Sequence, residues 1–132
     1  MINLKKSIKV VGAIIINEHE EILCALRSEN MSLPNYWEFP GGKVEPNELV
    51  EEAIIREIKE ELNCVINPLQ IFNDTTYEYE NVIVNLITIC AEIIDGTPTA
   101  TEHDELRWVS KANLNELNWA PADIPAVKQL MN

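Results

Sequence analysis

Residues 42–64 read GKVEPNELVEEAIIREIKEELNC, and this stretch says more about the chain than the rest of its sequence. Apolar residues at helical spacing predict a helix over its second half. On that helix Glu57, Glu60 and Glu61 stand at positions i, i+3 and i+4, so the three carboxylates share one face. Like charges at this spacing repel each other, and a bound divalent cation is the most economical reason for keeping them together.

The predicted helix begins at Pro46 or Asn47, with Asn47 as a candidate cap, and ends at Asn63. Asparagine tolerates the left-handed conformation that ends many helices, and Pro68 prevents the helix from continuing. The apolar stripe that should face the core consists of Ile54, Ile55, Ile58 and Leu62.

Two interpretations of the acidic face compete. One is an ordinary charged surface helix, because the whole protein is acidic. Against it, Glu57 and Glu61 border the apolar stripe instead of opposing it, and the bare backbone of Gly41-Gly42 just upstream can approach a ligand closely. Carboxylate and carbonyl oxygens suit Mg²⁺, with Mn²⁺ as a substitute. Such a metal can activate water toward a phosphoanhydride, so the second interpretation is a hydrolase.

Length and composition indicate one domain over residues 1–132. The chain has 132 residues, of which 46% are apolar and 24% charged. The net charge of −12 argues against binding to a nucleic-acid polymer or an anionic membrane, because both need clustered Lys and Arg. The three cysteines are predicted to be buried, reduced thiols. No stretch resembles a signal peptide or a membrane span, so a cytoplasmic location is expected.

Apolar runs between turn signals predict the remaining elements. A β-branched run at residues 8–17 is expected to form a buried strand, with residues 22–27 returning beside it as a hairpin. The last helix is expected within residues 121–131, starting late because of Pro125. The other expected elements are strands at 37–39, 73–79, 82–94 and 106–109 and a short helix at 111–116.

The fixed residues of the opening stretch resemble the signature of the Nudix family, and we call residues 42–64 the signature segment. Gly42, Glu48 after five residues, and the run from Arg56 to Glu61 after seven more follow the pattern G-x5-E-x7-R-E-U-x-E-E-x-G-U. Asn63 replaces the last glycine, a mild change because asparagine also adopts positive φ. The resemblance implies an α/β protein with the Nudix fold, an α/β/α sandwich with a central mixed β-sheet.

The resemblance also implies a metal site and a catalytic set. The implied metal ligands are Gly42 through its carbonyl, Glu57, Glu60, Glu61 and Glu102. The implied catalytic residues are Arg56, Glu57, Glu60, Glu61 and Glu102. Arg56, paired with Glu48, would orient a catalytic glutamate. An exposed loop acid is the alternative for Glu102, and His103 beside it is expected at the loop surface because Mg²⁺ prefers oxygen ligands.

Residues 36–45 and 119–125 are similar to MutT-type nucleoside triphosphatases, and most similar to the bacterial CTP pyrophosphohydrolase branch. Enzymes of this kind attack the β-phosphorus of a nucleoside triphosphate and release the monophosphate and pyrophosphate. The substrate-binding residues that the resemblance implies are Arg27, Glu38, Phe39, Tyr79 and Asp123.

These five residues have distinct expected roles. Arg27 is expected to contact the phosphates, although an arginine at the end of a strand is otherwise unremarkable. Asp123 is expected either to accept a hydrogen bond from a base, such as the N4 amine of cytosine, or to cap the last helix. Glu38 is expected to provide a second acceptor for the base edge, and Phe39 or Tyr79 to stack on the base.

The sequence therefore predicts a Mg²⁺-dependent (deoxy)nucleoside triphosphate pyrophosphohydrolase that cleans the nucleotide pool. CTP, dCTP or a modified pyrimidine nucleotide is the expected substrate, and 8-oxo-dGTP is the alternative. Residues 80–84 lack the arginine that 8-oxo-dGTP-selective members place there, which weakens the alternative. A nucleotide-sensing module without catalysis is less favoured because no signature glutamate is lost, and ADP-ribose and dinucleoside polyphosphates are further substrates to consider. A monomer or homodimer is expected.

Overall fold

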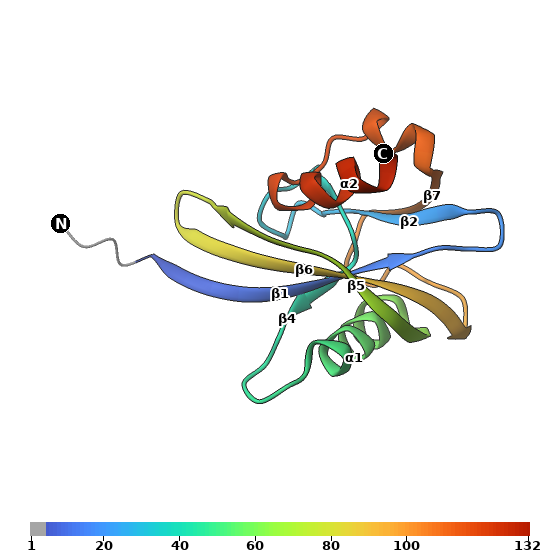
Figure 1. Cartoon of the computed structure of the whole chain (residues 1–132), viewed down its shortest axis with the longest axis horizontal. Helices are drawn as coiled ribbons and strands as arrows, with labels where there is room; N and C mark the ends of the chain where they lie inside the picture. The colour runs from blue at the N-terminus through green and yellow to red at the C-terminus, as the bar shows by residue number, and fades with distance from the viewer. Residues whose placement is uncertain (1–4) are drawn as a thin grey trace.

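Within residues 5–132, which the computed structural model describes, seven strands form two sheets. The first sheet has the strand order β4-β1-β6-β5 and the second has the order β3-β2-β7. Helix α1 (Val50–Leu62) lies on one side of the first sheet, and α2 (Ile124–Met131) lies on the other side with the second sheet (Figure 1). The strands are β1 (Lys6–Ile15), β2 (Glu21–Leu26), β3 (Trp37–Glu38), β4 (Gly41–Lys43), β5 (Val65–Glu78), β6 (Val82–Asp95) and β7 (Glu105–Ser110).

The second half of β1, residues 11–15, is buried between the two helical layers. Strand β1 pairs antiparallel with β4 and parallel with β6, so the first sheet is mixed. Because side chains alternate along a strand, Val11, Ala13 and Ile15 pack into the core under α1, whereas Ile14 packs into the core on the α2 side. This arrangement confirms the expected α/β class with helices on both sides of a mixed sheet.

The expected hairpin between residues 8–17 and 22–27 is wrong. β1 and β2 meet only through an isolated bridge between Ile16 and Ile22, and then separate into different sheets. The edges of β1 are already occupied by β4 and β6, so β2 pairs with β3 and β7 instead.

Helix α1 ends as expected but begins later. Asn63 adopts the left-handed conformation, with φ 53° and ψ 39°, and its N–H donates to the carbonyl of Lys59. The start at Pro46 or Asn47 is wrong: Asn47 has φ 66° and lies in a turn, and the helix begins at Val50. The Glu52 side chain accepts from the N–H of Leu49 at 2.9 Å, which satisfies one free donor at the helix start.

The buried stripe of α1 differs from the predicted stripe at one position. Ile54, Ile58 and Leu62 are fully buried, but Ile55 is 38% exposed and Ala53 takes its place in the core. Strand β5 is also longer than expected, since it begins at Val65 and continues through Pro68 with register shifts. A proline without an N–H is tolerated there because β5 is an edge strand of the first sheet.

The C-terminal region follows the expected order. Residues 111–116 form a short 3₁₀ helix, η1 (Lys111–Glu116), and a second one, η2 (Pro121–Asp123), precedes α2. Helix α2 therefore starts late, at Ile124, as Pro125 predicts.

The three cysteines lie in the described part of the chain and are free. Cys24 and Cys64 are buried, as expected, while Cys90 is half-buried. Burial raises the pKa of the Cys24 thiol to about 12, so this thiol stays protonated and unreactive. Among residues 5–132, no helix has both the length and the apolar character needed to cross a membrane.

Candidate functional site

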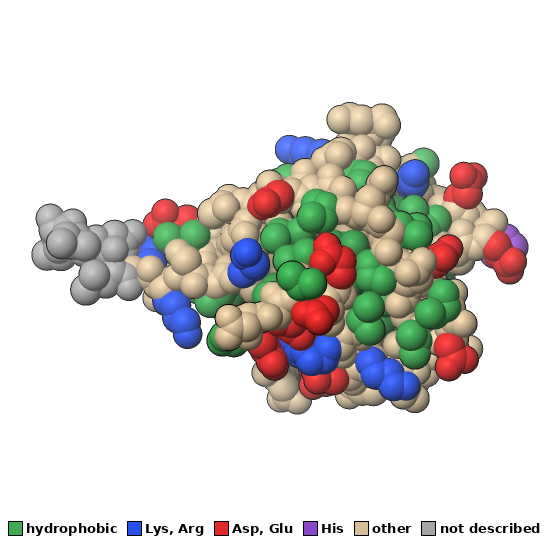
Figure 2. Space-filling view, turned by 60° about the horizontal axis from the view of Figure 1, so that its bottom comes forward, with side chains coloured by type: hydrophobic (Ala, Val, Ile, Leu, Met, Phe, Trp, Pro, Cys, Tyr) green, Lys and Arg blue, Asp and Glu red, His purple; other side chains and the backbone are tan. Residues whose placement is uncertain are grey.

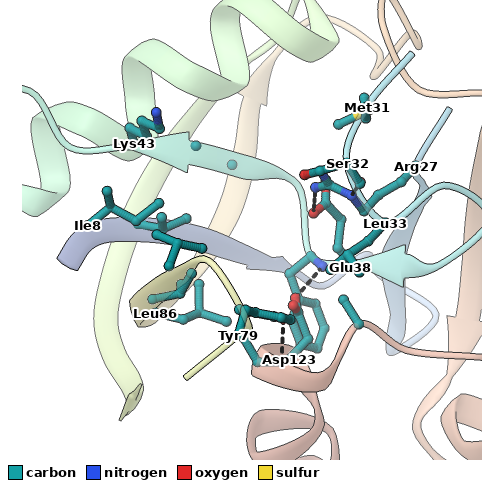
Figure 3. A pocket seen from close by; sticks show the side chains of 18 of the residues that line it. Ile8, Arg27, Met31, Ser32, Leu33, Glu38, Lys43, Tyr79, Leu86 and Asp123 are labelled. Atoms are coloured by element: carbon teal, nitrogen blue, oxygen red, sulfur yellow. Dashed lines mark hydrogen bonds and ion pairs between the residues drawn. The ribbon is translucent and has the colours of Figure 1, made fainter. Parts of the chain in front are cut away.

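A pocket of about 600 Å³ lies between the first sheet, the loop after β2 and the segment before α2. Figure 3 shows side chains from these elements around it. Gly42 and Glu61 from the signature segment line it, and so do Tyr79 and Asp123. The pocket therefore joins the signature segment to residues expected to bind a nucleotide. Apolar side chains of β1 and β6 also line it, namely Ile8, Val10, Val82, Val84 and Leu86.

Arg56 is the centre of an ion-pair network beside this pocket. Its Nε and Nη2 donate to the two oxygens of Glu48 at 2.8 and 2.9 Å, and its Nη1 donates to Glu57 Oε1 at 2.9 Å. Nη2 also donates to the carbonyl of Lys43 at 3.0 Å, which ties α1 to β4. The hydrogen bonds from Arg56 lower the pKa of Glu48 to about 2, so this carboxylate stays ionised. Figure 2 shows acidic and basic side chains packed together on one face of the molecule.

The absence of a side chain at Gly42 leaves room for the Glu57 carboxylate. A Cβ at position 42 would lie 2.4 Å from the carboxyl carbon and from Oε2 of Glu57, a distance that atoms cannot adopt. The carboxylate therefore lies directly against the backbone of β4. The contact between Arg56 and Glu57 holds it there from the other side.

Glu61 is the most buried acid of the signature segment. It is 8% exposed, and its Oε2 has no hydrogen-bond partner within the described residues. Burial, followed by the negative charges of Glu38, Glu57 and Glu102, raises the pKa of Glu61 to about 9. An unpartnered carboxylate oxygen among further carboxylates, beside a bare glycine backbone, is a donor set that fits a hard divalent cation.

The other two expected ligands lie at the rim of this region. The Glu60 side chain is 59% exposed, and its ion-pair contact is with Arg56 at 3.5 Å. Glu102 is exposed, and the preceding Thr101 anchors its loop by donating from Oγ1 to the carbonyl of Glu61 at 2.8 Å. In the described chain, no three His, Cys, Asp or Glu side chains already form a metal-binding cluster. The carboxylates share one region of the molecule, and their roles as ligands stay predictions.

Arg27, Glu38 and His103 form a second polar network. Arg27 Nη1 donates to Glu38 Oε1 at 2.6 Å, and its Nε and Nη2 donate to the carbonyl and the hydroxyl of Ser32 (Figure 3). Three of the guanidinium hydrogens are thus used within the protein, which leaves the others for a phosphate. His103 Nε2 lies 2.9 Å from Glu38 Oε2. The expectation that His103 lies at the loop surface is wrong, because its side chain is 0% exposed.

Asp123 lies at the wall of the pocket formed by η2. Its Oδ2 accepts from the backbone N–H of Phe39 at 3.0 Å, and its side chain makes no capping hydrogen bond to α2 within the described chain. The helix-cap alternative is therefore wrong for this residue. Burial and the charge of Glu38 raise the pKa of Asp123 well above its ordinary value, so a proton on this carboxyl is favoured.

Phe39 and Tyr79, the two expected stacking rings, are both engaged with the protein. Phe39 is 3% exposed and packs on Trp119, with ring centroids 4.8 Å apart. The Tyr79 hydroxyl accepts from the N–H of Ala122 at 3.0 Å, and its ring contacts that of Tyr77 at 4.6 Å. Both residues still line the pocket, and stacking on a base stays a prediction.

Several pocket residues were not singled out in the sequence. The alternation of Ile8 and Val10 along β1 was a usable signal, because it places both side chains on one face of the strand. Residues of the loop after β2 gave no such signal, since their position depends on the Arg27 contacts. The pocket residues that were missed in these loops and strand ends are Met31, Ser32, Leu33, Lys43, Glu80 and Asn81.

Comparisons with known proteins extend over nearly the whole chain. The profile of the NUDIX domain matches residues 6–130. The chain is 31% identical over 125 residues to an 8-oxo-dGTP diphosphatase of Escherichia coli K12, covering 95% of this chain and 97% of the relative. It is 36% identical over 126 residues to the CTP pyrophosphohydrolase of the same organism, covering 96% and 93%. A solved structure described as a MutT protein, family Nudix hydrolase, from methicillin-resistant Staphylococcus aureus 252 is 52% identical, with a TM-score of 0.79 and coverage of 97% and 98%.

Proposed function

This chain belongs to the Nudix family, and we propose that it is a divalent-metal-dependent pyrophosphohydrolase that splits a nucleoside triphosphate and water into the monophosphate and pyrophosphate. The observation that carries the proposal is the position of Glu61. Its buried, unpartnered oxygen lies in the wall of a pocket that also contains the nucleotide-binding candidates. In its ionised form this carboxylate would repel a polyphosphate in the same pocket unless a cation lay between them.

The residues that would hold Mg²⁺ or Mn²⁺ are Gly42 through its carbonyl, Glu57, Glu60, Glu61 and Glu102. When bound, the cation supplies polarisation of a phosphoryl oxygen and screening of the polyphosphate charge. Other residues of the chain hold these ligands in position. Arg56 fixes the carboxylate of Glu57 and, through Glu48 and Lys43, fixes α1 relative to β4. Arg27 has guanidinium hydrogens left for the phosphates.

We propose a cytosine nucleotide, CTP, dCTP or a modified dCTP, as the preferred substrate. Asp123 reaches the pocket with a carboxyl oxygen, which accepts a hydrogen bond from an exocyclic amine in either protonation state. The same oxygen also suits the N1–H and N2 amine of guanine, so 8-oxo-dGTP is the second candidate. The two Escherichia coli relatives support the two candidates equally.

The experiment is a pyrophosphate-release assay on the purified chain with Mg²⁺ and a panel of CTP, dCTP, 5-methyl-dCTP, 8-oxo-dGTP and ATP. We expect turnover of the preferred nucleotide and its loss when EDTA removes the metal. Glu60→Gln and Glu61→Gln should abolish turnover while the protein stays folded by circular dichroism. Glu51→Gln, an exposed acid on the same helix, is the matched control and should keep full activity. Full Mg²⁺-dependent activity in both the Glu60 and Glu61 variants would refute the proposal.

The absence of pyrophosphate release from every nucleotide, together with measurable nucleotide binding, would favour the nucleotide-sensing module. We place the enzyme in the cytoplasm, as a monomer or homodimer. The three free thiols are in keeping with a reducing compartment. The net charge of −12 supports a small nucleotide, and not a nucleic-acid polymer or a membrane, as the partner.

A further inference from the structure

His103 is a buried titratable side chain for which the proposed reaction provides no role. Its imidazole is 0% exposed, yet its neighbours in the sequence, Glu102 and Asp104, are exposed. The Nε2 atom lies 2.9 Å from Glu38 Oε2, and Nδ1 has no hydrogen-bond partner among residues 5–132. Burying an imidazole with one unpaired nitrogen is unfavourable unless the other nitrogen makes a valuable contact.

The hydrogen on this contact can be assigned. A carboxylate only accepts hydrogen bonds, so Nε2 of His103 carries the hydrogen and donates it to Glu38. The other oxygen of Glu38 accepts from Arg27 at 2.6 Å. Glu38 is therefore held by two donors, one just after β2 and one in the segment before β7, and its side chain is only 14% exposed.

The segment that carries His103 is fixed at both ends. Thr101 donates from its hydroxyl to the carbonyl of Glu61, at the end of α1. The N–H of Asp104 donates to the carbonyl of Leu26, next to Arg27, at 3.0 Å. The segment thus spans from the acidic region to the Arg27 network, and it places the imidazole beside Glu38.

We infer that His103 is a positioning residue for nucleotide binding: it holds the Glu38 carboxylate, and through Glu38 it fixes Arg27 at the wall of the pocket. Both Glu38 and Arg27 line the pocket, whereas His103 stands behind them. This inference rests on the proposed function, since it holds that His103 keeps the nucleotide-binding site in its correct shape. Without the imidazole, Glu38 loses one of its two donors and Arg27 loses its fixed partner.

The test compares side chains that differ in reach. Glutamine places an N–H donor at about the reach of imidazole Nε2, whereas asparagine, with the same amide, is too short. Steady-state kinetics of His103→Gln, His103→Asn and His103→Leu are compared with wild type on the best nucleotide of the panel. The control is His19→Leu, because His19 is the other histidine and its side chain is 74% exposed.

We expect His103→Asn and His103→Leu to raise KM about tenfold, the factor for losing one hydrogen bond to a charged group, with kcat within about threefold of wild type. His103→Gln should stay within about threefold in both constants, and His19→Leu should match wild type. Adding Glu38→Gln to His103→Leu should raise KM no further than the more defective single variant. Equal defects in the Gln and Asn variants, or a lower melting temperature with unchanged KM, would overturn the inference.

A second measurement does not depend on turnover. In ¹⁵N-edited NMR spectra of the wild-type protein, the buried histidine should give a downfield Nε2–H signal that moves upfield in Glu38→Gln. A signal that does not move overturns the inference, even if the leucine variant fails to fold. If the wild type hydrolyses no nucleotide but the signal moves as expected, the proposed function fails while the contact between His103 and Glu38 stands.

Discussion

Replacing Gly42 by alanine should damage the site much more than the fold, because the three atoms nearest to the new Cβ all belong to the Glu57 carboxyl group. The contact distance would be 2.4 Å, and ordinary van der Waals contact begins near 3.4 Å, so the Glu57 carboxylate must retreat by about 1 Å. The end of a flexible side chain can do this at a cost to stability of about 1 kcal/mol, or about 4 °C in melting temperature. A displacement of about 1 Å in a catalytic group lowers kcat about 100-fold.

Two other glycines provide the controls. At Gly41 a Cβ would lie 1.9 Å from the carbonyl oxygen of Val11, which belongs to the backbone of β1 and cannot move aside. Gly41→Ala should therefore cost about 3 kcal/mol and lower the melting temperature by about 12 °C. At Gly12 the nearest atom would be 3.4 Å away, in ordinary contact, so Gly12→Ala should be nearly silent.

The measurements are pyrophosphate release with Mg²⁺ and calorimetric melting of the three variants. We expect Gly42→Ala to be folded with kcat about 100-fold lower, Gly41→Ala to be unstable, and Gly12→Ala to resemble wild type. Wild-type kcat in Gly42→Ala would refute the reasoning, because Glu57 would then not need its position against β4. A melting temperature as low as that of Gly41→Ala would also refute it, because the contact would then be structural.

Three further predictions follow from the contacts of single side chains. Arg56→Lys should lower kcat about 100-fold in the pyrophosphate-release assay, because a lysine cannot hydrogen-bond Glu57 and the other Arg56 partners at the same time. Activity near that of wild type would mean that a positive charge at position 56 is enough to position Glu57. Tyr79→Phe keeps the ring but leaves the Ala122 N–H without its acceptor, so the free energy of unfolding should fall by about 1 kcal/mol in urea titrations. KM should also rise a few-fold, and an unchanged KM would mean that only the ring of Tyr79, and not its hydroxyl, contributes to nucleotide binding. The pKa of Glu61 is raised from the ordinary 4.5 of a glutamate to about 9, so between these pH values the folded protein keeps a proton that the unfolded chain releases. The metal-free protein should therefore lose stability as pH rises from about 4.5 toward about 9. Melting curves should show a flatter pH dependence for Glu61→Gln, and Mg²⁺ should stabilise the wild type more at about pH 8 than at about pH 5, because metal binding releases the proton.

Features that depend on near neighbours in the chain could be predicted from the sequence. The signature segment forms a helix that ends in a left-handed Asn63, because both features follow from spacing and local backbone preference. The first residue of that helix could not be predicted, since Arg56 holds Glu48 from two turns away and keeps the preceding residues in a turn. Similarly, the exposure of Ile55 depends on which side of α1 meets the sheet, and not on its own apolar character.

Contacts between distant segments account for most of what the sequence left open at the site. His103 stands among charged residues and gives every local sign of a surface position, but its partner Glu38 lies 65 residues earlier. Arg27 was expected to face the phosphates, and its contacts with Glu38 and Ser32 follow only from the folded loop. The sequence thus offered candidate residues for binding a metal and a base, and these roles stay predictions, whereas the hydrogen-bond networks that hold the residues could not be predicted.

The parallel pairing of β1 with β6 has a consequence for how the chain folds during synthesis. Lys6 pairs with Val82 and Ile15 with Ala91, so the two residues of each pair are more than half of the chain apart in sequence. Strand β1 leaves the ribosome well before β6, so Val11, Ile14 and Ile15 stay uncovered until β6 has also emerged. Loops of this length close slowly, and folding of the nascent chain should be a late event that depends on its C-terminal half.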